Sequence, residues 1–428
     1  MNKASSIGKD RLEREMNLSK LALVFVMAVD VMGQGLAFPI FNTLMTSPGS
    51  GLLPADTSAA VRQLDYGVVI GVFFLTWFLG AVYISRVSDS IGRKAGILIC
   101  LTGALLGYAL TIVAVIWNSF WLLLLSRAIT GFTSGNQPIA QAAMVDMSRD
   151  EMEKVRNMGL IVAGFSAGLI GGPIIGAVFA SPDFPGASLV LPFYVGGGLI
   201  ALAMLLIGWF FEEPEASRTS LRIEPLEVVI LLWEVTRRPT ILRISAPYLL
   251  YMMGFMIFYV FFDDLLSSRY GLGTGGTSLG MLVLGITTAF ASLVALPVLS
   301  QRASRLQVLI LMTAMEMVAL IILIGVRSEI LAFAMIGLMG GAHAIAYPTY
   351  LNLFSPAAPK TEQGWVMGVS TALFTLAAAM ASFIAGIVSE ESLNAVFLVG
   401  FGGLAVALLL TLTIWRAPGM RELAAARA

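Results

Sequence analysis

Four side chains that carry or exchange a charge lie deep inside long apolar stretches of this sequence. They are Asp30, Arg127, Glu316 and His343. A charge at the depth of a lipid bilayer costs about 2.5 to 3.5 kcal/mol on insertion scales, so each residue needs a partner or a purpose. Acids and a histidine inside a membrane are typical of proton relays. We therefore expect these four residues to couple transport to protons.

A row of polar side chains accompanies the two N-terminal charges. Gln34 follows Asp30 by one helical turn and shares its face. After Arg127, polar residues at spacings of three and four line one face of a predicted helix. This row is predicted to line a substrate cavity, and its members are Gln34, Ser134, Asn136, Gln137 and Gln141. A purely structural ion pair between Asp30 and Arg127 is the alternative interpretation.

Glu316 and His343 provide the corresponding chemistry in the second half of the chain. Glu316 is mid-stretch with no basic residue nearby in sequence, and His343, the only histidine, is in the next stretch. A carboxyl in low dielectric is readily neutral near neutral pH. Two interpretations stay open, which are a proton relay and plain hydrogen bonds between helices. One histidine and one cysteine, Cys100, predict no metal site and no disulfide within the chain.

Membrane-spanning helices must position these residues. The chain is 58% hydrophobic and 12% charged, with a mean hydropathy of +0.88, which leaves too few polar side chains for a soluble enzyme. Apolar blocks of about 20 to 25 residues are long enough to cross about 30 Å of hydrocarbon. Twelve spans are predicted, at about 20–43, 67–87, 95–117, 120–145, 157–180, 189–211, 243–262, 277–300, 307–326, 330–353, 365–388 and 394–415.

The Lys and Arg residues predict the orientation, because these residues accumulate in cytoplasmic loops. Among the connections on the side opposite the N-terminus, only Arg62, Arg269 and Arg327 carry this charge. Both termini are therefore predicted to be cytoplasmic. The 26 basic residues equal the 26 acidic ones, so there is no basic excess for binding nucleic acid.

A charged connection in the middle of the chain separates six spans from six. The predicted organisation is an N-terminal tail at 1–19, a six-helix half at 20–211, a linker at 212–242, a second half at 243–415 and a tail at 416–428. An amphipathic helix at the membrane surface is expected near 224–236. The predicted fold is an all-α integral membrane protein with twelve transmembrane helices in two six-helix halves around a central cavity. This pattern is typical of secondary transporters.

A short basic loop joins the second and third spans. It reads Ser85-Arg-Val-Ser-Asp-Ser-Ile-Gly-Arg-Lys94. Gly92 permits a tight reversal, and Asp89 is suited to cap or face a helix N-terminus. A plain basic turn that follows the orientation rule is one interpretation of this loop.

The fifth span carries glycines at every fourth position, which form one smooth face for close helix packing. The row consists of Gly164, Gly168, Gly172 and Gly176, with a kink expected at Pro173. Simple helix packing is one interpretation of this row.

These stretches resemble the major facilitator superfamily. The loop matches its signature at Asp89, Gly92, Arg93 and Lys94, whereas Ser85 and Ser90 depart from it. The resemblance implies that the four matching residues gate the transport cycle. The fourth span resembles the family motif at Arg127, Gly131, Gly135 and Asp146, where the resemblance implies that the arginine serves proton coupling. The glycine row resembles the antiporter motif of drug–proton exchangers, except that Ala177 replaces a frequent glycine. Asp30-Val-Met-Gly-Gln-Gly-Leu-Ala-Phe-Pro39 is similar to the start of tetracycline and multidrug efflux proteins.

The resemblance implies a non-enzymatic, proton-coupled exporter of a small organic molecule in a bacterial inner membrane. Its expected partners are the substrate, protons and the lipid bilayer. No cofactor is expected, and the protein is expected to be a monomer. The sequence shows no nucleotide-binding loop, so an ion gradient is the expected energy source. A proton-coupled transporter of a specific polar metabolite or siderophore, in either direction, is the alternative, and a non-transporting receptor or scaffold is a third interpretation.

Overall fold

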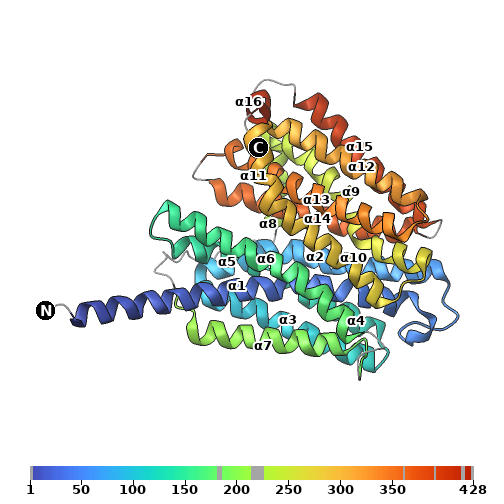
Figure 1. Ribbon diagram of the computed structural model, residues 1–428, viewed down its shortest axis with the longest axis horizontal. Helices are drawn as coiled ribbons and strands as arrows, with labels where there is room; N and C mark the ends of the chain where they lie inside the picture. Colours follow the sequence, from blue (N-terminus) through green and yellow to red (C-terminus); the bar gives the residue numbers. More distant parts are fainter. Residues whose placement is uncertain are drawn as a thin grey trace. The chain divides into compact units, whose positions relative to one another are not determined.

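The apolar stretches form long helices. The computed structural model describes residues 3–180, 186–213, 226–359, 362–389, 392–415 and 420–425, and these contain helices and no strand (Figure 1). Eleven of the described helices are long and apolar enough to cross a membrane. A twelfth crossing is split into two shorter helices, and the predicted all-α membrane fold is confirmed. Lys360 and most of the linker, residues 214–225, lie outside the described residues.

The chain divides into two compact units by the contacts between its helices. One unit contains Met1–Ala37 and Leu79–Glu224, and the other contains Phe38–Phe78 and Pro225–Ala428. The first two helices therefore contribute to both units. The helices of the N-terminal part are α1 (Lys3–Thr46), α2 (Ala59–Ile91), α3 (Arg93–Ile116), α4 (Phe120–Phe132), α5 (Asn136–Asp146), α6 (Glu151–Phe179) and α7 (Leu191–Phe210), with a short turn of 3₁₀ helix at Pro48–Ser50.

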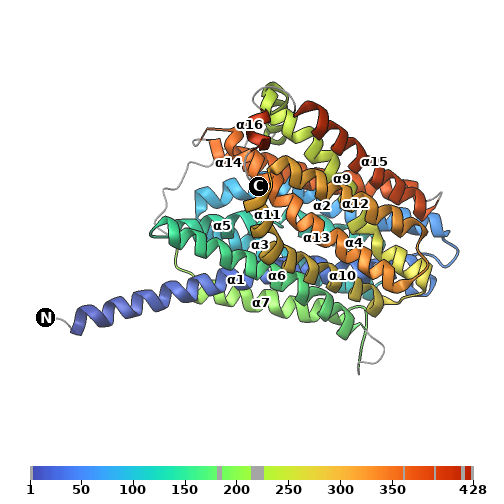
Figure 2. The ribbon, with the colours of Figure 1, turned by 45° about the horizontal axis from the view of Figure 1, so that its top comes forward.

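In the first unit, α3 packs against both α4 and α7 (Figure 1). In the second unit, α9 is the most buried helix and packs against α14 and α15, while α12 and α13 lie side by side (Figure 2). The helices of this part are α8 (Glu227–Arg237), α9 (Pro239–Tyr270), α10 (Thr274–Phe290), α11 (Leu296–Arg302), α12 (Arg305–Gly325), α13 (Glu329–Phe354), α14 (Gln363–Val388), α15 (Leu393–Ile414) and α16 (Met420–Ala425), with a π-helical turn at Ala291–Ala295 and a 3₁₀ turn at Ser355–Ala357. The helix α8 agrees with the helix expected near 224–236.

The predicted fourth span is not one continuous helix. It breaks after Phe132 and restarts at Asn136. Pro138 provides the physical reason, because its ring would clash with the carbonyl of Ser134 in a continuous helix and it has no N–H to donate. The prediction of one polar helical face running from Arg127 through Gln141 is therefore wrong. The residues before and after the break belong to separate helices.

The seventh span is longer than predicted. It was expected to end at residue 262, but α9 continues to Tyr270 and ends at Gly271, whose φ is 67°. Asp263 and Asp264 consequently lie inside the helix and are buried. The eighth span also differs, because Pro297 follows a π-helical turn between α10 and α11.

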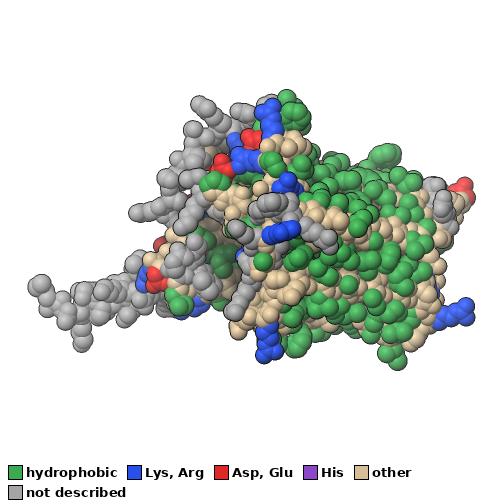
Figure 3. Space-filling model, turned by 90° about the horizontal axis from the view of Figure 1, so that it is seen from above, with side chains coloured by type: hydrophobic (Ala, Val, Ile, Leu, Met, Phe, Trp, Pro, Cys, Tyr) green, Lys and Arg blue, Asp and Glu red, His purple; other side chains and the backbone are tan. Residues whose placement is uncertain are grey.

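Hydrophobic side chains cover most of the right-hand part of the face drawn in Figure 3, and Lys and Arg side chains lie mainly to the left of that part and at its right-hand end. Large exposed residues such as Trp121 and Trp209, at 76% and 74% exposure, face outward from their helices. A surface of this kind fits a bilayer, since aromatic side chains are enriched at membrane interfaces.

Candidate functional site

Glu316 belongs to a buried cluster in the second unit. Its side chain on α12 is fully buried, and the Tyr251 hydroxyl on α9 donates to its Oε1 over 2.6 Å. The same hydroxyl lies 3.0 Å from His343 Nδ1 on α13. Glu316 Oε2 has no hydrogen-bond partner among the described residues. The structure thus joins the two ionisable residues of the C-terminal half through a tyrosine that the sequence reasoning did not single out.

The three side chains form a hydrogen-bonded chain that works in two directions. A hydroxyl has one proton to donate and lone pairs to accept with. When Tyr251 donates to a Glu316 carboxylate, His343 Nδ1–H donates to the Tyr251 oxygen. When Glu316 is protonated and donates, Tyr251 donates to His343 Nδ1 instead. The Tyr251 hydroxyl therefore connects Glu316 to His343, whose Oε1 and Nδ1 atoms lie 3.9 Å apart.

Aromatic rings hold His343 in place for this contact. The imidazole stacks on Phe255 with an interplanar angle of 7° and on Tyr251 with an angle of 9°. Tyr347, one turn further along α13, stacks on its other flank at 19°. This packing fixes the orientation of the ring, so Nδ1 points toward Tyr251.

Asp30 has a different environment in the first unit. It is half-buried on α1, and the Asn136 amide on α5 donates to its Oδ1 over 2.9 Å. Tyr108 on α3 lies close enough to interact with the charges of both Asp30 and Arg127. Arg127 itself is only 3% exposed on α4. Asn136, predicted to line the substrate cavity, is thus the direct partner of Asp30.

The other predicted cavity residues are half-buried. Ser134 lies in the break between α4 and α5, where its hydroxyl donates to the Thr130 carbonyl over 2.7 Å. Gln34 on α1 and Gln137 and Gln141 on α5 are intermediate in exposure. These amides remain available to a ligand, whereas the Ser134 hydroxyl is committed to the helix end.

The glycine row of α6 packs against α1, the helix that carries Asp30. Its four members, Gly164, Gly168, Gly172 and Gly176, are all buried. A Cβ on Gly168 would lie 2.3 Å from the Ala28 carbonyl oxygen, so only glycine allows this approach. Pro173 fits against Gly35 in the same interface. Close packing on both sides of Asp30 fixes the depth and direction of its carboxyl.

The basic loop between α2 and α3 is tied down by acids. Gly92 adopts φ 110°, which favours glycine, and Glu213 accepts from the backbone N–H groups of Arg93 and Lys94 at 2.5 and 2.8 Å. Glu213 thus fills the capping position predicted for Asp89. Asp89 instead pairs with the Arg93 guanidinium, whose Nε also lies 3.3 Å from Asp146 at the end of α5.

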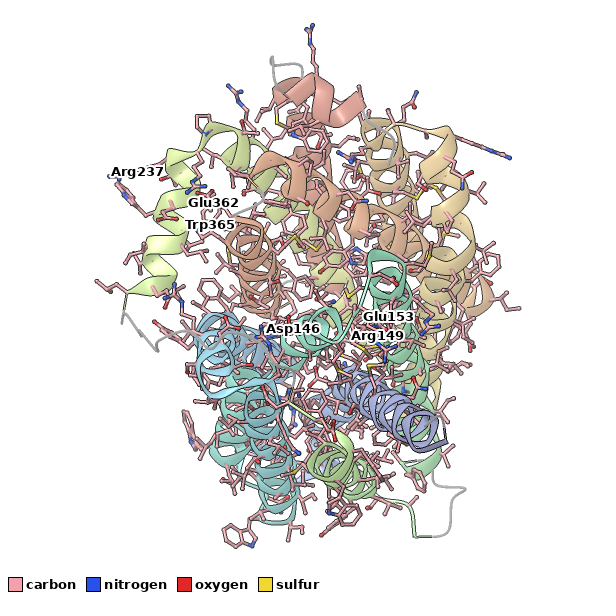
Figure 4. The ribbon with its side chains drawn as sticks, turned by 90° about the vertical axis from the view of Figure 1, so that its left-hand side faces the viewer. Asp146, Arg149, Glu153, Arg237, Glu362 and Trp365 are labelled. Carbon is pink, nitrogen blue, oxygen red and sulfur yellow. The ribbon has the colours of Figure 1, made fainter. Side chains whose placement is uncertain are left out.

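A second ion pair lies at the start of α6. Figure 4 shows Arg149 and Glu153 close together there, with Asp146 at the end of α5. Glu153 accepts from Lys20 Nζ on α1 over 2.5 Å and from the Arg149 backbone N–H. The Lys20 hydrogen bond lowers the pKa of Glu153. Because the folded-state pKa lies below the unfolded value, this contact stabilises the fold at neutral pH and is lost as the pH falls through the folded-state pKa.

The helix α8, which belongs to the second unit, is held to the start of α14 by the residue that follows it. Arg238 pairs with Glu362 and stacks over Trp365 at 4.2 Å from the ring centroid, and Figure 4 shows Glu362 and Trp365 next to α8. The Glu362 hydrogen bond raises the pKa of Arg238. The contact anchors the linker to the start of α14.

Three residues that the structure places in buried or hydrogen-bonded positions were not singled out from the sequence, which are Tyr251, Glu213 and Asp263. Tyr251 and Glu213 are distant in sequence from the residues they bind, and no local spacing reveals such a contact. The burial of Asp263 could have been predicted from the sequence. Apolar residues follow it at Leu265 and Leu266, which argues against ending the helix at residue 262.

Comparisons with known proteins agree with this architecture. The family model of the Major Facilitator Superfamily matches residues 22–382. The class B tetracycline resistance protein of Escherichia coli is 25% identical over 94% of this chain and 97% of its own length. The quinolone resistance protein NorA of Staphylococcus aureus (strain MRSA252) is 26% identical over 54% of this chain and 56% of its own length.

Among solved structures, the human organic anion transporter MFSD10 aligns with a TM-score of 0.70 and 20% identity, covering 92% of this chain and 99% of its own. At that identity the likeness concerns the fold alone. Together with the helical architecture and the family match over most of the chain, it leads to one assignment. The chain is a multi-pass membrane protein that belongs to the Major Facilitator Superfamily of transporters.

Proposed function

We propose that this transporter exports a small organic molecule in exchange for protons, by alternating access across a bacterial inner membrane. Both termini face the cytoplasm in this proposal, as the distribution of Lys and Arg predicts. The substrate class is that of amphiphilic drugs, for which the similarity to tetracycline and quinolone resistance proteins is the support. The working unit is a monomer.

The observation that carries the proposal is the Glu316–Tyr251–His343 chain. A carboxyl with one unpartnered oxygen and no exposed surface is costly as an anion, because burial without a compensating donor costs several kcal/mol. The neutral form is therefore favoured in this state of the protein. When the transport cycle admits water to Glu316, the proton leaves, and the Tyr251–His343 path gives it a route.

The residues of the first unit complete the proposal. Asp30 and Arg127 provide a second ionisable pair of groups, and Gln34, Gln137 and Gln141 provide amides for substrate contacts. Arg93, with Asp89 and Asp146, gates the cycle at the basic loop. The close contact between α6 and α1 holds Asp30 rigidly while the rest of the cycle proceeds.

Proteoliposomes with an imposed proton gradient test this function. Purified protein is assayed with tetracyclines, quinolones and siderophores, and drug movement against its own gradient is measured. Glu316→Gln keeps the shape of the side chain but cannot titrate, so uphill transport is expected to fall by about tenfold or more while downhill exchange survives.

Glu329→Gln is the matched control, because Glu329 is an exposed glutamate at the start of α13. It is expected to retain the parent rate. Uphill drug transport by Glu316→Gln with the parent's pH profile would show that Glu316 is structural. Proton-driven movement of a siderophore but of no drug would overturn the substrate class.

A further inference from the structure

The second unit contains a tight contact that joins the end of α1 and the start of α2 to the end of α9 and the start of α10. This contact lies on the face of the protein that carries the loop between Thr46 and Ala59. We call this face the loop face. The contact, called the loop-face seal below, is made by four pairs of residues: Phe38 with Tyr259, Thr43 with Thr274, Gln63 with Asp264, and Tyr66 with the Val260 carbonyl.

Two adjacent acids of α9 lie inside this seal. Asp263 is fully buried, and neither of its carboxyl oxygens has a hydrogen-bond partner among the described residues. Asp264 is 2% exposed, and its Oδ2 accepts from Gln63 Nε2 over 2.9 Å. Asn42 on α1 lies beside Asp264, and its Oδ1 accepts from the Ser267 hydroxyl over 3.4 Å. The seal thus encloses one acid with a donor and one acid without.

The ionisable groups around Asp263 do not offset a negative charge on its carboxyl. Its ionisable neighbours are Asp264, Tyr66 and Tyr259, while α10, α14 and α15, which pack on α9, carry no ionisable side chain. On α2, Asp65 is half-buried, and Arg62 donates to the carbonyls of Met45, Ser47, Pro54 and Thr57.

Other ionisable groups on α9, α12 and α13 have hydrogen-bond partners of their own. Arg269 donates to the carbonyls of Leu323 and Val326 and to Asn394, and Tyr270 also donates to Val326. Glu316 and His343, from α12 and α13, contact α9 at Tyr251. Twelve residues of helix, about 18 Å, separate that level from Asp263.

An ionised Asp263 is therefore incompatible with a closed seal. Burial of a carboxylate that accepts no hydrogen bond costs several kcal/mol, and the neighbouring Asp264 adds repulsion when it is charged. The neutral acid carries a much smaller penalty. When the α1 and α2 ends separate from α9, water reaches the carboxyl and the charged form becomes favourable.

We propose that Asp263 is a proton-binding site that controls the loop-face seal, which closes only when Asp263 has taken up a proton. The proton comes from water on the loop face and returns there when the seal reopens, so this site gates the cycle and carries no proton across. The proposal rests on the alternating-access function proposed above. It adds a second pH-sensitive acid, separate from Glu316.

Disulfide cross-linking across the seal tests the proposal. The Thr43 and Thr274 hydroxyls are 2.8 Å apart, so Thr43→Cys and Thr274→Cys, in a Cys100→Ala background, place two thiols within bonding reach. Cross-linking is followed in membranes between about pH 6 and about pH 9 without substrate. Because the closed state holds one more proton, its ratio to the open state is expected to change by up to about tenfold per pH unit.

Asp263→Asn is the decisive variant, because it keeps the shape of the side chain and is neutral at every pH. Its cross-linked fraction is expected to stay high at the alkaline pH values at which that of the parent falls. The pH dependence of thiol reactivity is the same in both proteins, so it cancels in the ratio of their cross-linked fractions. Asp263→Ser, smaller and also neutral, is expected to behave in the same way if Asp263→Asn folds poorly. Asp65→Asn is the matched control and is expected to follow the parent.

The outcomes separate this proposal from the transport function. If Asp263→Asn and Asp263→Ser both cross-link with the parent's pH dependence, Asp263 does not gate the seal, whatever the transport assay gives. If cross-linking depends on pH through Asp263 but no drug moves under a proton gradient, the gate stands and the proposed export function fails.

Discussion

Asp30 and Glu316 are both acids inside membrane helices, yet their surroundings differ. Asp30 is half-buried and receives a hydrogen bond from an amide, the Asn136 side chain. Glu316 is fully buried, receives its hydrogen bond from Tyr251 and retains one oxygen without a donor. An amide only donates here, whereas a tyrosine also relays a proton onward. The comparison teaches that depth alone does not describe an acid's surroundings, because Asn136 only holds the Asp30 carboxyl, whereas Tyr251 also connects the Glu316 carboxyl to a second titratable group.

The largest effect is expected from Asp30→Asn. If Asp30 changes its charge during the cycle, a permanently neutral side chain should abolish proton-driven transport, with a loss of at least about tenfold, while the protein still inserts. The measurement is drug uptake into everted vesicles after an imposed pH step, with membrane abundance determined in parallel. The exposed Asp56→Asn is the control. Wild-type flux in Asp30→Asn would leave proton coupling to the C-terminal half alone.

A smaller effect, but a sharper one, is expected from Tyr251→Phe. The ring packing stays, but the Glu316–His343 path loses its middle member, so the pH profile of uphill transport should change and its rate should fall by about 3-fold to 10-fold. The control is Tyr248→Phe, one turn earlier on α9, whose buried hydroxyl has no hydrogen-bond partner among the described residues. Equal pH profiles for the two variants would argue against a relay.

The smallest effect on chemistry is expected at the basic loop. Asp89→Asn or Arg93→Ala should slow turnover several-fold while leaving substrate affinity nearly unchanged, because the loop acts on a conformational equilibrium and not on the ligand. Substrate binding and transport rate are measured on the same preparation. Arg302→Ala, an exposed residue of the corresponding loop in the second half, is the comparison. Weaker binding at an unchanged turnover rate would contradict the gating role.

The fold was largely predictable because membrane helices are specified by local composition. Apolar runs predicted the crossings, and the charged linker predicted the helix α8. Two of the errors concern signals that the sequence does carry close to the affected positions. Pro138 ends the continuous helix by a clash with the Ser134 carbonyl, and Asp263 with Asp264 was taken to end a span that continues to Tyr270.

The site was predictable only as a set of residue types. Asp30, Arg127, Glu316 and His343 stand out because charges inside apolar stretches are costly. Their partners do not stand out, since Tyr251 lies 65 residues before Glu316 and Asn136 lies 106 residues after Asp30. Such contacts depend on the angle and register between helices, which a single sequence does not determine.

The break before Asn136 makes α5 a short separate helix that binds a charged side chain at each of its ends. Its first residue, Asn136, holds the Asp30 carboxyl, and its last residue, Asp146, holds the Arg93 side chain at the basic loop. The helix α5 has eleven residues and is about 16 Å long, so it moves as one rigid body when either end is displaced. A displacement of Asp30 is therefore transmitted to Arg93 by a tilt of α5. The non-helical residues before Asn136, next to Pro138, allow this tilt.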